Sequence, residues 1–408
     1  MRTTGRSAAA SIAALLTVLS FAPAGARPAR LQKQSFTVIA VVDSGINPYH
    51  LDFRRPDLTA HPATYVTGYP NSTRALDLHL GARDLASARQ ADAEEWARLA
   101  EGELRWIPGT NIIGIVGIQN IGESAGFDEF GHGTGVASVA AGMRHGPGRE
   151  DILLVSVEGT DRGLAWAAEQ PWIDIITNSW SVLTPVLDET AEASHRAVES
   201  GKIVCFASGN LHAPLIFLEG QGPSWHVNVG AASSKSRTER WYTGYPNDVL
   251  GLSGFDAASN TSIDGTREFG GTSAAAPWVC SHIAQTLATA RRNLGDTREG
   301  PHGGGLAAGR KGRGYLDDGV LDRLELEDAV QSTAVPASSE PDPDDPNTVP
   351  ALPVAPYLRG GYGIVDGDTI RDGLKVIFGK MPRPEREMEG AWIAATDALR
   401  DRIWGDPP

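Results

Sequence analysis

The chain has 408 residues, enough to bury a full hydrophobic core and to divide into two or three domains. Its formal net charge of −14 argues against nucleic acid as a partner, because nucleic acid is bound by positively charged surface. Two cysteines are too few for a disulfide framework, which excludes the disulfide-stapled scaffolds.

Residues 1–26 have the pattern of a secretory signal peptide. Arg2 and Arg6 precede an apolar run from Ala8 to Ala22, and small residues follow as far as Ala26. A disordered N-terminus or a membrane anchor is the alternative interpretation. No later stretch reaches the roughly 18 continuous apolar residues of a membrane span. We therefore expect a secreted protein in the extracellular, periplasmic or cell-wall space, with a signal typical of bacteria.

The first predicted strand leads into an aspartate. After a short leader at residues 27–35, residues 38–48 read VIAVVDSGINP, an apolar and β-rich run. This pattern predicts a buried strand with Asp43 at its C-terminal end. Open α/β sheets place their sites at that end, so Asp43 is a candidate site residue.

Residues 50–111 are predicted to be an insertion. Within it, residues 83–103 are alanine-rich and carry Leu85, Trp96 and Leu99 at helical spacing. We expect a surface helix, with a lid or exosite beside the cleft as the alternative. Its acidic residues predict a solvated face rather than a metal site; they are Asp84, Asp92, Glu94, Glu95, Glu101 and Glu103.

A histidine opens the next block. Residues 130–142 read FGHGTGVASVAAG, which places His132 in a glycine-rich turn before a helix of small residues. A turn and a strand at residues 106–118 lead into it. Beyond it, strands and helices alternate, which implies right-handed crossovers and a parallel sheet. The predicted strands are 152–157, 173–180, 203–210 and 227–232, and the predicted helices are 161–170 and 188–199.

Two further blocks carry polar residues. The strand from Ile203 leads through Ala207, Ser208 and Gly209 to Asn210. Residues 268–280 read EFGGTSAAAPWVC, which predicts a tight turn feeding a helix with Ser273 in its first turn. Free backbone N–H groups and the helix dipole can hold an oxyanion there. Taken alone, this stretch is equally compatible with an ordinary helix N-cap.

The four blocks together supply what acyl transfer from a serine requires. Serine is a poor nucleophile at neutral pH, so an imidazole must take its proton and a buried carboxylate must orient that imidazole. Ser273, His132 and Asp43 can fill these roles. The Asn210 side-chain amide and the Ser273 backbone N–H can bind the tetrahedral oxyanion.

The segments VVDSGI, GHGTGVASVAAG, ASGN and GTSAAAP, in this order, resemble the blocks of the subtilisin-like serine proteases, or subtilases. The resemblance implies a subtilisin-like α/β three-layer sandwich over residues 36–380, with a mainly parallel sheet covered by helices on both faces. It also implies a monomeric serine endopeptidase acting on protein or peptide, without a cofactor. Whether the protein binds a structural calcium ion stays an open question. The implied substrate-binding residues are Ser179, Trp180, Ser181, Ala207, Ser208 and Gly209.

Several residues depart from the family pattern. Gly135 stands where many members carry a second histidine, and Trp278 stands where histidine is common. The substrate strand, usually Ser-Leu-Gly, reads Ser179-Trp180-Ser181, which should reshape the specificity pockets. The leader is also too short to be the folded pro-domain that many secreted members carry. Substrate preference is therefore not implied by the resemblance.

The helix that Ser273 opens should run to about Ala290. It carries Cys280, and resemblance brings it against the strand that carries Cys205. We favour two buried free thiols over a disulfide. His282 on the same helix is expected to be a core or boundary histidine.

The C-terminal part is predicted to be less regular. Residues 295–314 read as a flexible loop and residues 321–334 as a helix. Residues 335–356 form a proline-rich acidic excursion, which we interpret as a solvated linker rather than a calcium loop. Residues 360–380 resemble the turn and helix that close a subtilase domain, and residues 381–408 form a tail.

The sequence thus predicts a secreted serine endopeptidase. A dedicated maturation protease with one partner protein is the alternative within enzymes. A catalytically inert member that binds peptides is the alternative outside them.

Overall fold

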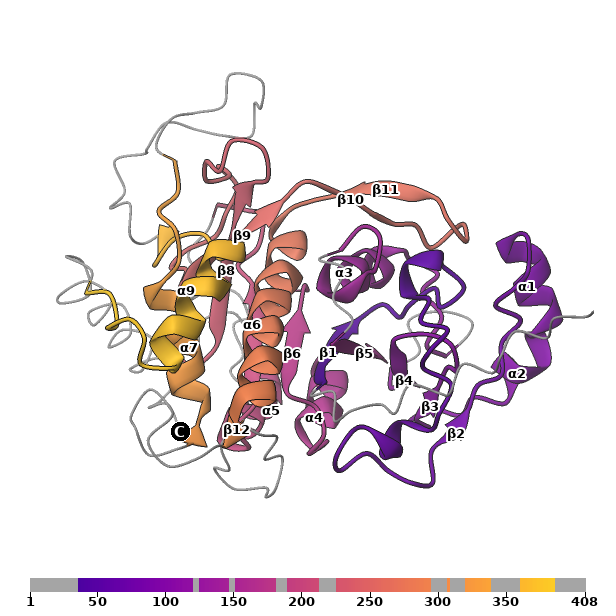
Figure 1. Ribbon diagram of the computed structural model, residues 1–408. Coiled ribbons are helices and arrows are strands. Elements are labelled where there is room, and N and C mark those ends of the chain that lie inside the picture. The colour runs from indigo at the N-terminus through magenta and orange to yellow at the C-terminus, as the bar shows by residue number, and fades with distance from the viewer. Residues whose placement is uncertain are drawn as a thin grey trace, which may run out of the picture. The chain divides into compact units, whose positions relative to one another are not determined.

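A nine-stranded sheet runs through the protein, with the strand order β2-β3-β4-β5-β1-β6-β7-β8-β9 (Figure 1). The computed structural model describes residues 36–119, 125–146, 151–180, 189–212, 225–294, 307–308, 320–338 and 360–385. Neighbouring strands are parallel except for β3 and β4, which confirms the mainly parallel sheet. The strands are β1 (Thr37–Asp43), β2 (Arg74–Ala75), β3 (Arg105–Trp106), β4 (Ile112–Gly117), β5 (Ile152–Glu158), β6 (Ile175–Asn178), β7 (Ile203–Ala207), β8 (Val227–Ser233) and β9 (Val249–Ser253).

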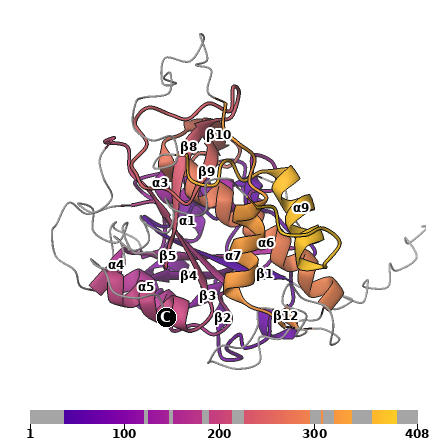
Figure 2. The same ribbon diagram turned by 90° about the vertical axis from the view of Figure 1, so that its left-hand side faces the viewer.

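Helices cover both faces of the sheet, as predicted (Figure 2). Alternate residues of β1 point to opposite sides because the side-chain period of a strand is two. Ile39 and Val41 pack beneath α3 and α6, whereas Val38, Ala40 and Val42 belong to the cluster that α4 and α5 cover. The helices are α1 (Leu85–Ala91), α2 (Ala93–Ala97), α3 (His132–Ala141), α4 (Asp161–Ala168), α5 (Glu189–Glu199), α6 (Thr272–Leu294), α7 (Arg323–Ser332) and α9 (Gly367–Ile377).

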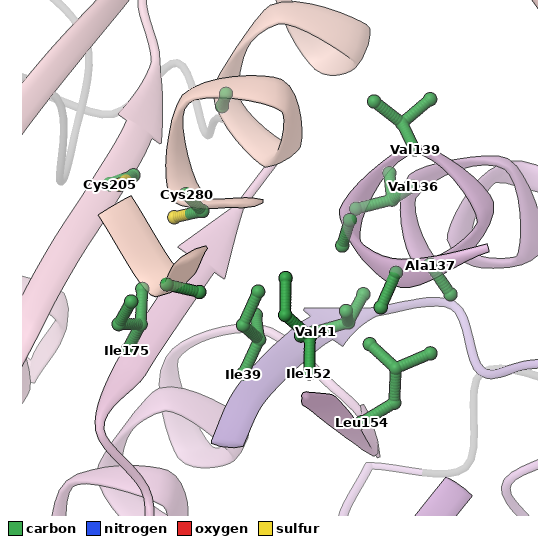
Figure 3. Packing of buried hydrophobic residues seen from close by; sticks show 14 of the residues in the cluster. Ile39, Val41, Val136, Ala137, Val139, Ile152, Leu154, Ile175, Cys205 and Cys280 are labelled. Carbon is green, nitrogen blue, oxygen red and sulfur yellow. The ribbon is translucent and has the colours of Figure 1, made fainter. Parts of the chain in front are cut away.

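The hydrophobic core on the α3 and α6 face packs β1, α3 and α6 together, and these elements carry the candidate site residues. Figure 3 shows aliphatic side chains of β1, β5 and β6 beneath Val136 and Val139 of α3, with Cys280 of α6 beside Cys205 of β7. Each such aliphatic side chain contributes about 1.5–3 kcal/mol when fully buried. Both cysteines are buried free thiols, as the sequence favoured, and burial raises the pKa of the Cys205 thiol well above its usual value.

The insertion differs from its prediction at Asp92. One helix was expected over residues 83–103, but the chain breaks at Asp92 into α1 and α2. The break turns this carboxylate inward, where it is 1% exposed and accepts hydrogen bonds from the Tyr49 hydroxyl at 2.8 Å and the His79 amide at 2.7 Å. The prediction of a solvated face is therefore wrong for Asp92. Trp96 is buried beside it and donates to the Tyr49 hydroxyl at 2.8 Å.

Residues 241–264 show no strong pattern in the sequence, yet they contain β9 and half of a hairpin. The hairpin consists of β10 (Phe255–Ala258) and β11 (Thr266–Phe269), paired antiparallel, and it passes over α3 (Figure 1). Polar residues in both strands hide the alternation that would have indicated them.

At the C-terminal end, α7 and α9 pack on each other and on α6. Within the predicted loop at 295–314, the structure describes only β12 (Ala307–Ala308), which pairs with β13 (Val320–Leu321). The predictions for the signal peptide, the leader, residue 181, residues 339–356 and the tail beyond residue 385 lie outside the described residues.

Candidate active site

Asp43 and His132 meet at the C-terminal edge of the sheet. Asp43 is the last residue of β1 and is 5% exposed, and His132 is the first residue of α3. The His132 Nδ1 lies 2.8 Å from Oδ1 and 3.0 Å from Oδ2 of Asp43. Because a carboxylate accepts hydrogen bonds, this contact assigns the proton to Nδ1 and leaves Nε2 as the basic nitrogen.

A second aspartate, which the sequence analysis did not single out, builds the turn before His132. Asp128 is fully buried and accepts hydrogen bonds from the Gly131 amide at 2.6 Å and the Thr134 amide at 2.7 Å. The Ser44 hydroxyl also donates to Asp128 at 2.8 Å and accepts from the Gly133 amide at 2.9 Å. These bonds satisfy free N–H groups at the start of α3. The signal in the sequence was an aspartate just before a helix, a typical capping residue.

The electrostatics of the site act on the base in opposite directions. Burial by itself lowers the pKa of His132, because it penalises the imidazolium. Three influences raise the pKa of His132: the hydrogen bond to Asp43, the negative charge of Asp43 and the negative charge of Asp128. Together they outweigh burial and hold the pKa of His132 above its usual value. Arg267 opposes them with its positive charge. The net effect favours a stable imidazolium, which a base needs once it has taken a proton.

Ser273 is the second residue of α6 and is half-buried. Pro277 lies inside that helix and has no N–H to donate to the Ser273 carbonyl four residues earlier. The Ser179 hydroxyl donates to this carbonyl instead, at 3.0 Å, and the Ser273 hydroxyl in turn donates to the Ser179 carbonyl at 3.2 Å. This reciprocal pair ties the predicted substrate strand to the candidate nucleophile.

Asn210 is held beside the start of α6 through Thr272. Its Oδ1 accepts hydrogen bonds from the Thr272 amide at 2.9 Å and the Thr272 hydroxyl at 3.1 Å. Since the oxygen is occupied, the Nδ2 amide group is the one left to donate. Gly271 has a φ of +73°, and a Cβ there would lie 2.9 Å from this Nδ2. Glycine at 271 thus allows both the turn and the close approach of Asn210.

The remaining predicted residues are those expected to bind substrate. Ser179, Ala207 and Ser208 are buried, and Gly209 is half-buried. Trp180 is half-buried, with its ring edge-on to Phe206 at 5.7 Å between centroids. Ser181 is outside the described residues.

The structure therefore joins the predicted residues in two pairs. Asp43 is bonded to His132, and Asn210 is joined through Thr272 to Ser273. Both His132 and Ser273 are among the described residues, and no hydrogen bond connects them, because the Ser273 hydroxyl rests on the Ser179 carbonyl. No cluster of three or more metal-ligating side chains occurs in the described part of the chain. The described helices include none that is both long and apolar enough to span a membrane.

One departure from the family pattern, Trp278, has a local explanation. Trp278 donates from Nε1 to the Val365 carbonyl at 2.9 Å and stacks on Phe255 with 4.9 Å between ring centroids. It thus links α6 to the segment before α9. His282 is buried against Trp278 at 4.5 Å, as expected for a core or boundary histidine.

Known proteins resemble this chain in sequence pattern and in fold. The sequence pattern of the subtilase family matches residues 34–299. Among solved structures, a lanthipeptide protease is 14% identical, with a TM-score of 0.50, covering 83% of this chain and 87% of its own. A cold-adapted subtilisin-like serine proteinase is 18% identical, with a TM-score of 0.45, covering 82% of this chain and 91% of its own. An epidermin leader peptide processing serine protease from Staphylococcus aureus is 13% identical, with a TM-score of 0.47, covering 84% of this chain and 76% of its own. No protein of curated function matches the chain.

Proposed function

Because the chain belongs to the subtilase family and has its fold, we propose that it is a serine endopeptidase with Asp43, His132 and Ser273 as its catalytic residues. One observation carries the proposal. The buried Asp43 carboxylate is hydrogen-bonded to Nδ1 of His132, at the end of the sheet where α6 presents Ser273. This arrangement fixes the basic nitrogen of the imidazole before any substrate binds.

The proposed reaction begins when the Ser273 hydroxyl exchanges its bond with the Ser179 carbonyl for one with His132 Nε2. His132 takes the hydroxyl proton as Ser273 Oγ forms a bond to the carbonyl carbon of the substrate. The oxygen of that carbonyl becomes an oxyanion, which the Asn210 Nδ2 group and the Ser273 backbone N–H stabilise. His132 then gives its proton to the leaving amine as the C–N bond breaks, which leaves an acyl-enzyme.

Water completes the cycle by the same route. His132 Nε2 removes a proton from the attacking water, and the second tetrahedral intermediate collapses with return of that proton to Ser273. Asp43 keeps Nδ1 protonated throughout and stabilises the imidazolium in both halves.

The substrate is a polypeptide in extended form. Ser179 directly follows β6 and lies beside Ser273, and we propose that an extended peptide pairs with the main chain there. We further propose that the protein acts outside the cytoplasm, because of the signal-peptide pattern in residues 1–26.

Labelling with a fluorophosphonate probe tests the proposal. The mature protein should become covalently labelled, and Ser273→Ala should not. Ser87→Ala, which changes an exposed serine on α1, is the matched control and should label like the wild type. Folded wild-type protein that stays unlabelled would contradict the proposed activity and favour a peptide-binding member without catalysis.

A second candidate function is a maturation protease dedicated to one partner protein. The insertion favours it, because α1 contacts the loop that leads to His132. Arg89 pairs with Glu129 at 2.8 Å, and its guanidinium lies over the Phe127 ring at 4.2 Å from the centroid. Digestion of an unfolded protein distinguishes the candidates: a general endopeptidase cuts at many sites, whereas a dedicated protease cuts at few or none.

A further inference from the structure

Gly135 and Phe269 are in close contact next to His132. Gly135 lies in the first turn of α3, and Phe269 is the last residue of β11. A Cβ on residue 135 would lie 2.6 Å from Cδ2 and 2.7 Å from Cε2 of Phe269, closer than real carbon atoms approach. The Phe269 ring therefore occupies the space that any larger residue at position 135 would need.

The same ring lies against His132. The centroids of the Phe269 and His132 rings are 5.4 Å apart, with 64° between the planes, and Phe269 is only 3% exposed. Edge-to-face pairs of this kind are attractive and have a preferred geometry. Asp43 holds the imidazole at one nitrogen only, which leaves rotation about that hydrogen bond open. A ring packed against the imidazole restricts this rotation.

The hairpin that carries Phe269 is anchored to the segments around the candidate site (Figure 1). Arg267 donates to the Gly131 carbonyl at 3.2 Å, and the Asn260 side-chain amide donates to the Asp128 carbonyl at 3.0 Å. On the other side, the Asn47 side-chain amide donates to the Ser262 carbonyl at 2.8 Å. The ring is thus fixed relative to the turn before His132 and to the loop after Asp43.

We propose that Phe269 is a positioning residue for the peptidase reaction: its ring, seated in the space above Gly135, orients the His132 imidazole toward Ser273. The inference rests on the proposed function. Phe269 is four residues before Ser273, so one short segment sets both the orientation of the base and the start of the nucleophile helix. A 1 Å misplacement of a reacting group can cost about 100-fold in rate.

Two variants disturb the contact from opposite sides. Phe269→Leu replaces the aromatic ring by a smaller aliphatic side chain. Gly135→Ala adds a methyl group that pushes the ring away, while it improves the helix propensity of α3. Each should lower kcat by about 10- to 100-fold with little change in KM, because orientation matters in the chemical step rather than in binding. Phe255→Leu is the matched control, since Phe255 pairs with Phe269 in the hairpin but stacks on Trp278. It should keep kcat within about threefold of the wild type, as expected of a change that leaves transition-state contacts intact.

The pH profile provides a readout that general weakening of the fold would not move. The charged groups that act on His132 are Asp43 from β1, Asp128 from the turn before α3, and Arg267 from β11. Burial is the largest influence and lowers the pKa of His132, so exposing the imidazole raises that pKa. The acid limb of kcat/KM should therefore move to higher pH in Phe269→Leu and stay in place in Phe255→Leu.

The double variant Gly135→Ala/Phe269→Leu sharpens the test. The smaller leucine relieves the clash with the methyl group introduced at position 135, so the two losses should not add, and the double variant should be at least as active as Gly135→Ala. Wild-type kcat and an unmoved acid limb in both single variants would overturn the inference. Equal losses in Phe255→Leu and Phe269→Leu would overturn it as well, because they would show a general effect of the hairpin.

Failure of the inference can be separated from failure of the proposed function. If the wild type does not react with a fluorophosphonate, the peptidase proposal fails. The positioning role is then still measurable in protein labelled with ¹⁵N-histidine, because Phe269→Leu should shift the His132 ring resonances and their titration. Unshifted His132 resonances in that variant would overturn the positioning role by themselves.

Discussion

The two halves of the candidate site are built differently. In the half with Asp43 and His132, the two side chains are hydrogen-bonded to each other. Asp128 accepts hydrogen bonds from the backbone amides on either side of the histidine. In the half with Ser273 and Asn210, Thr272 holds the side-chain amide of Asn210, while the Ser273 hydroxyl donates a hydrogen bond to a backbone carbonyl. In the proposed mechanism, His132 is thus oriented before substrate arrives, whereas the Ser273 hydroxyl still has to change its hydrogen-bond partner. The proposal therefore assigns to substrate binding the step that brings the two halves together.

The largest effect is expected from a change in the hydrogen bond between Asp43 and His132. Asp43→Asn keeps the size of the side chain but offers an N–H group to His132 Nδ1, which favours the wrong tautomer. In triads of this type such a change lowers kcat by about 10⁴-fold. Steady-state kinetics on a peptide ester measures the loss, and circular dichroism should show an unchanged fold. A loss of less than tenfold would mean that the base half is not pre-set by Asp43.

A smaller loss is expected from the nucleophile half at Asn210. Asn210→Ala removes a donor for the oxyanion but leaves the base pair intact, so kcat should fall by about 10²–10³-fold with KM nearly unchanged. Fluorophosphonate labelling should still occur, only more slowly. A rise in KM without a fall in kcat would instead place Asn210 in substrate binding.

Thr272→Val tests how the amide of Asn210 is held. The variant loses the hydroxyl bond at 3.1 Å but keeps the amide bond at 2.9 Å. A net hydrogen bond contributes about 0.5–1.5 kcal/mol, which corresponds to roughly 2- to 12-fold in rate. In the Asn210→Ala background the same substitution should have no further effect. Additive losses would show that Thr272 acts independently of Asn210.

The smallest expected effect is on the pH profile. The base must be neutral to accept a proton, so activity is present above the pKa of His132 and lost as pH falls through it. Because that pKa is raised, the acid limb of kcat/KM should lie above the usual histidine value of about 6.5. Arg267→Gln removes a positive charge that lowers this pKa, and it should move the limb up by a few tenths of a pH unit, since exposed charges are screened. A downward shift would contradict the arrangement.

The sequence predicted the elements whose patterns are local. Asp43 after an apolar strand, His132 in a glycine-rich turn and Ser273 at a helix start could be read from neighbouring residues. Contacts between distant segments could not. The match of Gly135 with Phe269 joins positions 134 residues apart in number, and the inward turn of Asp92 depends on Tyr49 and His79. The hairpin was missed because its two strands are short, only one of them is mainly polar, and their position depends on contacts with distant segments.

The proline inside α6 has a consequence for when the start of this helix takes its final form during folding. Because Pro277 cannot satisfy the Ser273 carbonyl, that carbonyl depends on Ser179, 94 residues earlier in the chain. A free helix of this sequence, or a chain still emerging from the ribosome, lacks the contact. The geometry around Ser273 is therefore completed only when the sheet has assembled. Under the proposed function, a half-folded molecule therefore cannot yet cut the proteins around it.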